Sequence, residues 1–160
     1  MPAPHVRALS AADRRWAAQL LRQRWGSPRI VTRGQVHQAD RLPGFVAELD
    51  GRPAGLLTYH LGERECEVVS LDSLRERMGV ATALLNAVRD MARNAGCRRL
   101  WLITTNDNVS ALRFYQKRGW RLVALHRDAV TAARRLKPEI PQAGRDGIPL
   151  RDELELELLL

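Results

Sequence analysis

The sequence predicts an α+β domain, a three-layer α/β arrangement in which helices cover both faces of a mixed central sheet. Apolar positions recur first at helical spacing, then in three strand-like runs joined by tight turns, and then switch repeatedly between strand and helix. Strands joined by tight turns pair antiparallel, whereas a strand–helix–strand order adds a parallel crossover. A length of 160 residues is that of one ordinary domain, so we expect a single domain over residues 1–160.

The first half predicts one helix followed by an antiparallel meander. Ser10-Ala11-Ala12-Asp13 is typical of a capping box, and it opens a helix that runs to Gly26. Residues 27–44 hold two prolines and two glycines, which predict a loop with room for one short strand. Asp50-Gly51 is a hairpin turn, and residues 62–64 turn the chain again. Strands are therefore expected at residues 45–49, 54–61 and 66–71.

The second half predicts strands and helices in alternation. An apolar stripe with spacings of three and four residues marks an amphipathic helix that ends at Gly96, and its members are Ala81, Leu84, Leu85, Val88, Met91, Ala92 and Ala95. Residues 127–147 are irregular, and residues 154–158 alternate Leu with Glu. That alternation predicts a strand with one face in water, which could lie at a sheet edge and pair across a dimer. The remaining elements are expected as a strand at 100–105, a helix at 108–118 and a strand at 120–126.

The charge balance raises the question of a polyanionic partner. The chain has 26 Lys and Arg against 18 Asp and Glu, a net charge of +8. Such a balance could attract nucleic acid, an anionic membrane or a polyphosphate ligand. The basic residues are scattered, and no run of five occurs. We therefore expect no nucleic-acid partner, and either a solvated Arg-rich surface or a field that steers a small anion such as coenzyme A into a cleft.

The cysteines and the hydropathy pattern indicate the cellular compartment in which the protein is expected. Cys66 and Cys97 form no CxxC motif or Cys/His cluster, so no metal site is expected, and they fit a reducing compartment. No apolar run approaches the ~20 residues of a membrane-spanning helix. The N-terminus lacks the apolar core of a signal peptide, and Leu158-Leu159-Leu160 is too short to span a membrane. The expectation is a cytoplasmic protein without a membrane partner, either a monomer or a homodimer.

Residues 68–82 form the first segment that indicates chemistry. A strand ends, a turn follows, and an amphipathic helix begins. The first amides of a helix lack internal partners and lie at its positive end, so they can hold a pyrophosphate. Gly79 and Ala81 are small enough for a ligand to approach the backbone, and Arg75 and Arg77 add positive charge. An ordinary turn with a glycine gives the same pattern, so the segment alone is weak evidence.

Residues 106–120 form the second such segment. Asn108, Ala111, Leu112 and Tyr115 are spaced so that they share one face of a helix. Asn108 and Tyr115 then lie about 10 Å apart along the axis. The alternative is that Asn108 is only an N-cap and Tyr115 only a core residue.

Together the two segments resemble the GNAT N-acetyltransferase family, which transfers an acetyl group from acetyl-CoA to an amine. In Glu76-Arg77-Met78-Gly79-Val80-Ala81 the last two fixed positions match the family's first motif, Q/R-x-x-G-x-G/A. The family's second motif, N-x-x-A followed by Tyr and a Gly–aromatic pair, is matched in full from Asn108 to Trp120. The departure is Glu76, where the family has Gln or Arg. A carboxylate would repel a pyrophosphate, so we expect Glu76 to point outward.

The resemblance implies acetyl-CoA as cosubstrate and a cleft between two splayed strands. Backbone amides of Arg77, Met78, Gly79, Val80, Ala81 and Thr82 would hold the pyrophosphate. Val69 and Leu71 would pair with the pantetheine arm, and their strand would splay from residues 102–104. Asn108 would also bind the arm, and Tyr115 would protonate the departing thiolate.

The acceptor amine must lose a proton before it attacks, and the family often places a Glu on the strand that enters the first motif. Glu65 and Glu67 are there, and their spacing gives them the strand parity of Val69 and Leu71. We favour Glu67 because it lies nearer the expected thioester slot, although both could be exposed carboxylates. Other candidates for the acceptor side are His60, a possible base, together with Arg33, His37, Phe45, His126, Arg134 and Lys137.

The leading hypothesis is an acetyl-CoA-dependent N-acetyltransferase in which a small-molecule or peptide amine attacks directly in a ternary complex. A non-catalytic acyl-CoA-binding or sensor module on the same fold is the first alternative, and it predicts cofactor binding without turnover. A basic nucleic-acid-binding domain is the second, and it predicts steeply salt-dependent binding to DNA or RNA.

Overall fold

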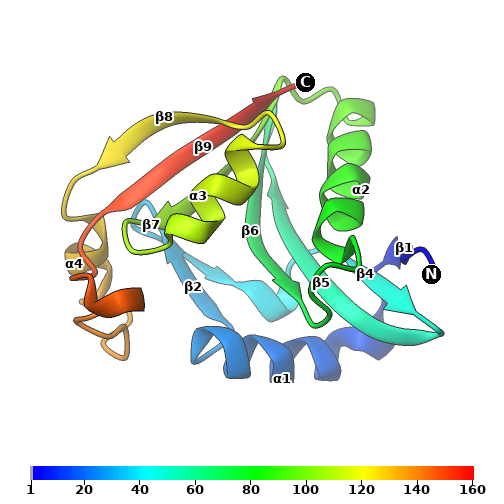
Figure 1. The fold of residues 1–160 in the computed structure, drawn as a ribbon, viewed down its shortest axis with the longest axis horizontal. Coiled ribbons are helices and arrows are strands. Elements are labelled where there is room, and N and C mark those ends of the chain that lie inside the picture. The colour runs from blue at the N-terminus through cyan, green and yellow to red at the C-terminus, as the bar shows by residue number, and fades with distance from the viewer. Residues whose placement is uncertain (1) are drawn as a thin grey trace.

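The computed structural model describes residues 2–160 and places helices on both faces of a seven-stranded mixed sheet (Figure 1). The strand order is β1-β4-β5-β6-β7-β9-β8. β6 and β7 are parallel and are joined by α2, so the predicted crossover and fold class are confirmed. The strands are β1 (His5–Ala8), β4 (Gly44–Leu49), β5 (Arg52–Leu61), β6 (Glu65–Ser73), β7 (Arg99–Thr105), β8 (Arg121–His126) and β9 (Glu153–Leu159). The helices are α1 (Arg14–Trp25), α2 (Val80–Asn94), α3 (Val109–Gln116) and α4 (Ala129–Ala133), and short 3-10 turns lie at Ala11–Asp13, Ala39–Arg41 and Arg145–Gly147.

The N-terminal helix starts and stops as its sequence predicts. The Asp13 carboxylate accepts a hydrogen bond of 2.8 Å from the Ser10 amide, which is one half of the capping box. Arg7 donates to the same carboxylate and holds the pKa of Asp13 well below its usual range. Gly26 ends the helix with a φ of 81°. The strand β1, which precedes this helix and pairs with β4 at the sheet edge, was not predicted.

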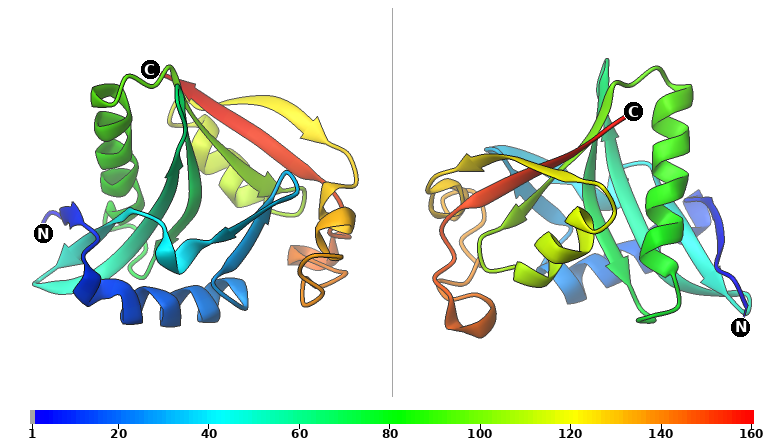
Figure 2. Two further views of the ribbon diagram at one scale, coloured as in Figure 1. Left: turned by 180° about the vertical axis from the view of Figure 1, so that it is seen from behind. Right: turned by 45° about the horizontal axis from the view of Figure 1, so that its top comes forward.

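Residues 27–44 form more structure than predicted. They contain a two-stranded hairpin, β2 (Arg29–Thr32) and β3 (Gln35–Gln38), where the sequence allowed one strand. The two turn residues, Arg33 and Gly34, both have positive φ values, 50° and 76°, which is the conformation that favours a tight hairpin. Arginine rarely adopts such a φ, so the turn carried no recognisable sequence pattern. Seen from behind, the hairpin lies over the sheet on the side of α1 (Figure 2).

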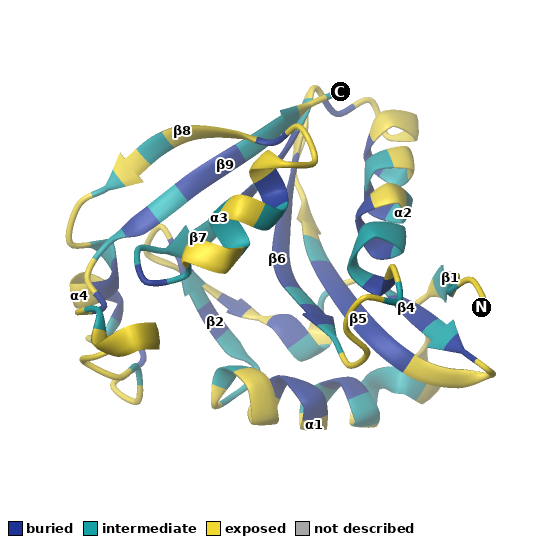
Figure 3. Cartoon of the chain, in the orientation of Figure 1, coloured by how far each residue is buried: buried dark blue, intermediate teal, exposed yellow. Residues whose placement is uncertain are grey.

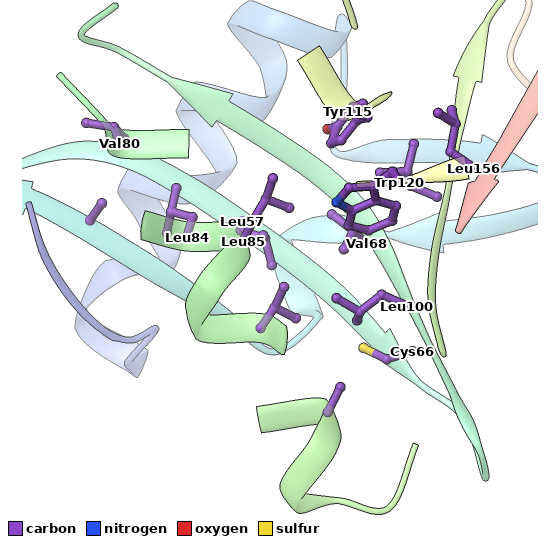
Figure 4. Packing of buried hydrophobic residues seen from close by; sticks show 14 of the residues in the cluster. Leu57, Cys66, Val68, Val80, Leu84, Leu85, Leu100, Tyr115, Trp120 and Leu156 are labelled. Atoms are coloured by element: carbon purple, nitrogen blue, oxygen red, sulfur yellow. The ribbon is translucent and has the colours of Figure 1, made fainter. Parts of the chain in front are cut away.

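Two apolar clusters hold the layers together. The larger one joins α2 and α3 to one face of the sheet, and Leu57, Leu84, Leu100 and Leu156 are fully buried in it (Figures 3 and 4). The smaller one joins α1 and the β2–β3 hairpin to the opposite face. The helix α2 therefore presents one continuous apolar stripe to the sheet, as its spacing predicts.

A β-bulge changes the side-chain alternation of β6. The register with β5 shifts between Thr58 and Tyr59, which leaves Val69 as the extra residue on β6. Val69 consequently belongs to the cluster under α1, while Leu71 packs against the cluster under α2. The expectation that Glu65, Glu67, Val69 and Leu71 share one parity is therefore wrong for Leu71.

The alternating C-terminal strand is not at a sheet edge. β9 lies between β7 and β8, with ladders to both, so the proposed edge pairing of this strand across a dimer is wrong. Its polar face is not in water either, because Glu153 is 2% and Glu155 is 6% exposed. The face is covered by the β2–β3 turn and by charged partners that are described below. No helix among residues 2–160 combines the length and the apolar character that crossing a membrane requires.

Gly55 sets how closely α2 approaches the sheet. A Cβ at this position of β5 would overlap Val80 and would lie 3.1 Å from both the Asp72 carbonyl oxygen and Leu84. We expect Gly55→Ala to push the first turn of α2 outward and to lower the free energy of unfolding by about 1–3 kcal/mol. Chemical denaturation measures this, with Asn86→Ala on the exposed face of α2 as control. A loss below about 0.5 kcal/mol, the usual range for surface changes, would contradict the close packing.

Candidate active site

A cavity of about 880 Å³ runs through the middle of the molecule. Its first half is lined by the ends of β6 and β7 and by α3, and includes Val69, Leu71, Ala81, Asn108 and Tyr115. Its second half is lined by the end of α1, by β2 and by the segment that precedes β9. The cavity thus brings five of the predicted cofactor or catalytic residues to one place.

The cavity exists because β6 and β7 separate. Their parallel pairing runs from Glu65–Arg99 to Val68–Leu102 and then stops. β6 nevertheless continues to Ser73 and β7 to Thr105, and the two ribbons diverge (Figure 1). The backbone of β6 beyond Val68 therefore has no ladder on the side of β7 among the described residues. Such an edge can pair with an extended ligand.

The turn before α2 lies at one mouth of the cavity. Arg77 and Gly79 have φ values of 61° and 76°, so the chain makes a tight turn that ends with Gly79 at the N-cap of α2. Glu76 is exposed, as expected. Val80 is 1% exposed and packs in the core, so its side chain fixes the helix end while its amide points along the helix axis toward the N-terminus. Met78 is partly buried against the same cluster, and Thr82 accepts a 3.1 Å hydrogen bond from Arg118.

Asn108 is the N-cap of α3 and also lines the cavity. Its side-chain oxygen accepts a hydrogen bond of 3.2 Å from the Ala111 amide, which caps α3. The same side chain lines the cavity, so its amide NH₂ is the group that remains for a ligand.

Tyr115 is a buried phenol that reaches the cavity from α3. It is 9% exposed and packs edge-on against Trp120 at 5.4 Å between ring centroids (Figure 4). It also packs edge-on against Phe114 at 5.1 Å. Burial raises the pKa of Tyr115 far above its usual value, and the negative charge of Asp72 raises it further. Asp72 is itself buried, accepts a 2.9 Å hydrogen bond from Trp25, and has a pKa raised by burial. The hydroxyl is therefore held in its protonated form.

Glu67 lies behind the cavity wall. It is 2% exposed, and its Oε2 accepts a hydrogen bond of 2.7 Å from the hydroxyl of Thr32, which does line the cavity. His37 Nε2 lies 3.2 Å from Glu67 Oε1 and 3.2 Å from the Thr32 hydroxyl, and its angle to Oε1 is poor for a hydrogen bond. Glu65 is exposed and pairs with Arg99 at 3.1 Å, so it does not reach the cavity.

Of the other residues predicted for the acceptor side, some line the cavity and others only make contacts that stabilise the fold. Lys137 lines the cavity but uses its ammonium to donate 2.7 Å hydrogen bonds to the carbonyls of Trp25 and Arg29. Arg134 donates to three carbonyls of the segment before β9, and His126 lies 3.0 Å from Glu155. The His60 ring is tilted against the His37 ring at 5.5 Å between centroids, and Phe45 stacks on Tyr59 at 5.8 Å; all four lie outside the cavity wall.

Thr32, Asp72 and Glu153 are among the wall residues that were not predicted from the sequence. Glu153 is 2% exposed, lines the cavity, and accepts a hydrogen bond of 2.9 Å from the Arg33 amide. Burial raises its pKa. The alternation of Leu and Glu placed Glu153 on the same face as Glu155 and Glu157, but only the position of β9 inside the sheet shows that this face is enclosed.

The raised pKa of Tyr115 can be measured because the chain has only two tyrosines. In a Tyr59→Phe background, the tyrosinate absorbance should appear well above the usual pKa of about 10. Asp72→Asn should lower the pKa of Tyr115 by removing a negative charge, while burial keeps it above the usual value. Titration followed by ultraviolet absorbance tests both statements, with circular dichroism at each pH to verify folding. An unchanged pKa in the Asn variant would mean that Asp72 does not act on Tyr115.

Known proteins share this architecture. The family model described as "Acetyltransferase (GNAT) family" matches residues 12–120. The uncharacterised Bacillus subtilis protein YdhI is 47% identical over 131 residues, which is 81% of this chain and 82% of that protein. A Bacillus subtilis acetyltransferase solved with CoA superposes with a TM-score of 0.72 at 17% identity, over 98% of this chain and 99% of that one. A GNAT family acetyltransferase from Elizabethkingia anophelis with acetyl-CoA bound gives a TM-score of 0.70 at 17% identity over the full length of both chains. From the splayed strands, the helix that follows them and the match over residues 12–120, the chain belongs to the GNAT family of acetyltransferases.

Proposed function

We propose that the protein transfers an acetyl group from acetyl-CoA to a primary amine, by direct attack within a ternary complex. The observation that carries this proposal is the cavity that opens where β6 and β7 separate and that has Tyr115 in its wall. Its two halves give a cofactor and an acceptor access to one point from different sides. Holding both reactants in such a geometry removes much of the entropic cost of a bimolecular step.

The cofactor half offers backbone groups to an acyl-CoA. The amides from Arg77 to Thr82 form the turn and first turn of α2, where partial positive charge favours a pyrophosphate. The backbone of Val69 and Leu71 lies on the part of β6 that has lost its pairing with β7. It can therefore hydrogen-bond the amide groups of a pantetheine arm, and a free amide near Val69 can also stabilise the oxyanion of the intermediate. Solved relatives in the family with CoA or acetyl-CoA bound support this use of the fold.

Tyr115 is the proposed general acid. Its raised pKa keeps a proton on the hydroxyl at neutral pH, and the cavity gives it access to the departing sulfur. As the C–S bond breaks, Tyr115 donates its proton to sulfur and regains one from the attacking nitrogen. The assistance is modest in scale, because a thiolate with a pKa near 8.5 is already a fair leaving group.

Glu67 is the proposed general base, and it acts through Thr32. An ammonium group at the wall gives one proton to the Thr32 oxygen, while the Thr32 hydroxyl proton moves to Glu67 Oε2 along the 2.7 Å hydrogen bond. The amine is then neutral and can form the C–N bond to the thioester carbon. The proton on Glu67 returns to solvent after release of the products.

A non-catalytic acyl-CoA module is the second candidate, and a paired measurement separates the two. We expect millimolar acetyl-CoA, but not AMP, to raise the Tm. If acetyl-CoA binds with a Kd of about 10 μM, a 100-fold excess adds about 2.7 kcal/mol of stability. This corresponds to about 5–10 °C for a domain of this size. Free thiol released with a panel of primary amines would identify the enzyme, whereas a Tm shift without thiol release for any amine would favour the module.

Kinetics of two variants test the proton transfers. Tyr115→Phe and Glu67→Gln should each lower kcat by about 100-fold, because each removes one proton-transfer group. Both should leave the Tm shift with acetyl-CoA nearly unchanged, since neither group holds the cofactor. Glu65→Gln is the matched control for Glu67→Gln, because Glu65 lies on the same strand but outside the cavity. Equal losses of cofactor affinity and kcat would show that Tyr115 or Glu67 has only a structural role.

A further inference from the structure

We propose that Glu153 binds the ammonium group of the acceptor, and that the acceptor is a small primary amine with an apolar body. This inference rests on the proposed function and names the substrate class for the second half of the cavity. It depends on one carboxylate without an ion pair, on the apolar part of the wall beside it and on the hydrogen bonds that hold that wall in place.

Glu153 differs from Glu155 and Glu157, on the same strand, in having no ion pair. Glu155 is within 4 Å of Arg99, Arg33 and His126, and Glu157 pairs with Arg99 at 2.9 Å. Among residues 2–160, no side-chain nitrogen of Lys, Arg or His lies within 4 Å of the Glu153 carboxylate. Its one hydrogen-bond donor in that range is the Arg33 amide, 2.9 Å from Oε1.

A carboxylate that is 2% exposed and lacks a cation is costly to bury. Glu153 lines the cavity, so a cation inside the cavity can supply the missing partner. An ammonium group does this with a charge-assisted hydrogen bond to Oε2, which no donor among the described residues occupies. The position also suits the chemistry, because Thr32 precedes Arg33 at the end of β2. The two carboxylates Glu153 and Glu67 therefore flank the same turn of the hairpin, one to hold the ammonium and one to receive its proton.

Part of the wall in this half of the cavity is apolar. Its apolar side chains are Ile30, Val130, Ala133, Ile140, Pro141 and Leu150, and the charged residues Lys137, Glu139 and Arg145 also line this half. The apolar part favours an uncharged hydrocarbon body over the backbone of a peptide or the second and third charges of a polyamine, because polar groups lose hydration there without gaining partners.

The segment that forms much of this wall is held in place by several hydrogen bonds. Lys137 binds the carbonyls of Trp25 and Arg29, and Arg29 donates in return to the Leu136 carbonyl at 2.7 Å. Arg134 ties Ile140, Pro141 and Leu150 together, and the Arg145 amide donates to Asp107 at 2.9 Å. These bonds join the segment to α1, to β2 and to the loop before α3. The acceptor half is therefore a chamber whose wall is fixed on this side, which suits a small molecule better than a protein chain.

The test uses phenethylamine as the probe and phenethyl alcohol as its uncharged counterpart. In the presence of CoA, phenethylamine should raise the Tm of the wild-type protein and phenethyl alcohol should do so much less. Glu153→Gln should weaken binding of phenethylamine by about 10- to 100-fold, the usual value of a hydrogen bond to a charged group. With acetyl-CoA, the same variant should raise the KM for phenethylamine more than it lowers kcat.

Glu157→Gln is the matched control, because Glu157 lies on the same strand and face but pairs with Arg99 outside the cavity. It should leave the KM for phenethylamine unchanged. Glu153→Asp keeps the charge and should retain part of the affinity, which separates loss of charge from damage to the fold. The Tm shift with acetyl-CoA verifies that each variant is folded.

The outcomes distinguish this inference from the proposed function. Binding of phenethylamine that depends on Glu153, without any thiol release, would support the ammonium site and contradict acetyl transfer. Thiol release with phenethylamine that is equal in wild type and Glu153→Gln would support acetyl transfer and overturn the role of Glu153. Turnover of spermidine or a short peptide in clear preference to phenethylamine would overturn the proposed substrate class, as would the absence of any phenethylamine binding.

Discussion

The parallel ladder between β6 and β7 ends at Val68 and Leu102, and the arrangement of the site depends on that interruption. Neither strand is left alone, because β6 keeps its pairing with β5 and β7 keeps its pairing with β9. The two halves of the sheet can therefore diverge without unravelling. The bulge at Val69 falls just past the last paired residue and increases the local twist of β6. Since β6 leads through one turn into α2, the end of that helix is held at the opening that the divergence creates.

Carboxylates lie on the face of the sheet opposite α2, and they are stabilised there in three different ways. Arg99 neutralises carboxylates from β6 and β9 together, and its pKa is raised by their hydrogen bonds despite the opposing effect of burial. Glu67 accepts a hydrogen bond from the Thr32 hydroxyl and lies 3.2 Å from His37 Nε2. Glu153 receives a backbone amide alone. Full neutralisation stabilises a fold, whereas partial neutralisation leaves a site with capacity for a ligand. On β9, Glu155 has three cationic side chains within 4 Å and Glu157 has one, whereas Glu153, in the cavity wall, has none.

Much of the fold could be predicted from the sequence because local patterns agreed with the tertiary structure. The stripe of α2, the cap at Asp13 and the glycines at 26 and 96 each specify an element without knowledge of its neighbours. The β2–β3 hairpin could not be predicted, because it turns at an arginine with positive φ. The burial of Glu153 and Glu155 could not be predicted either, because alternation along β9 gives two faces and does not say what covers them. The residues proposed to bind the cofactor followed from sequence motifs, whereas residues proposed for the acceptor side, such as Thr32, come together only through long-range contacts.

The wall of the proposed acceptor chamber comes mainly from one contiguous stretch, residues 130–150, and this stretch lies beyond the 12–120 region that matches the family. Its attachment depends on a few side-chain bonds to backbone carbonyls, and carbonyls are present whatever the side chains around them. Substitutions at Val130, Ala133 or Ile140 can therefore reshape the chamber while the turn before α2 and the hydroxyl of Tyr115 keep their positions. Proteins that descend from this chain could therefore come to accept different amines through substitutions in this one short segment. The residues proposed to bind the acyl donor would not need to change.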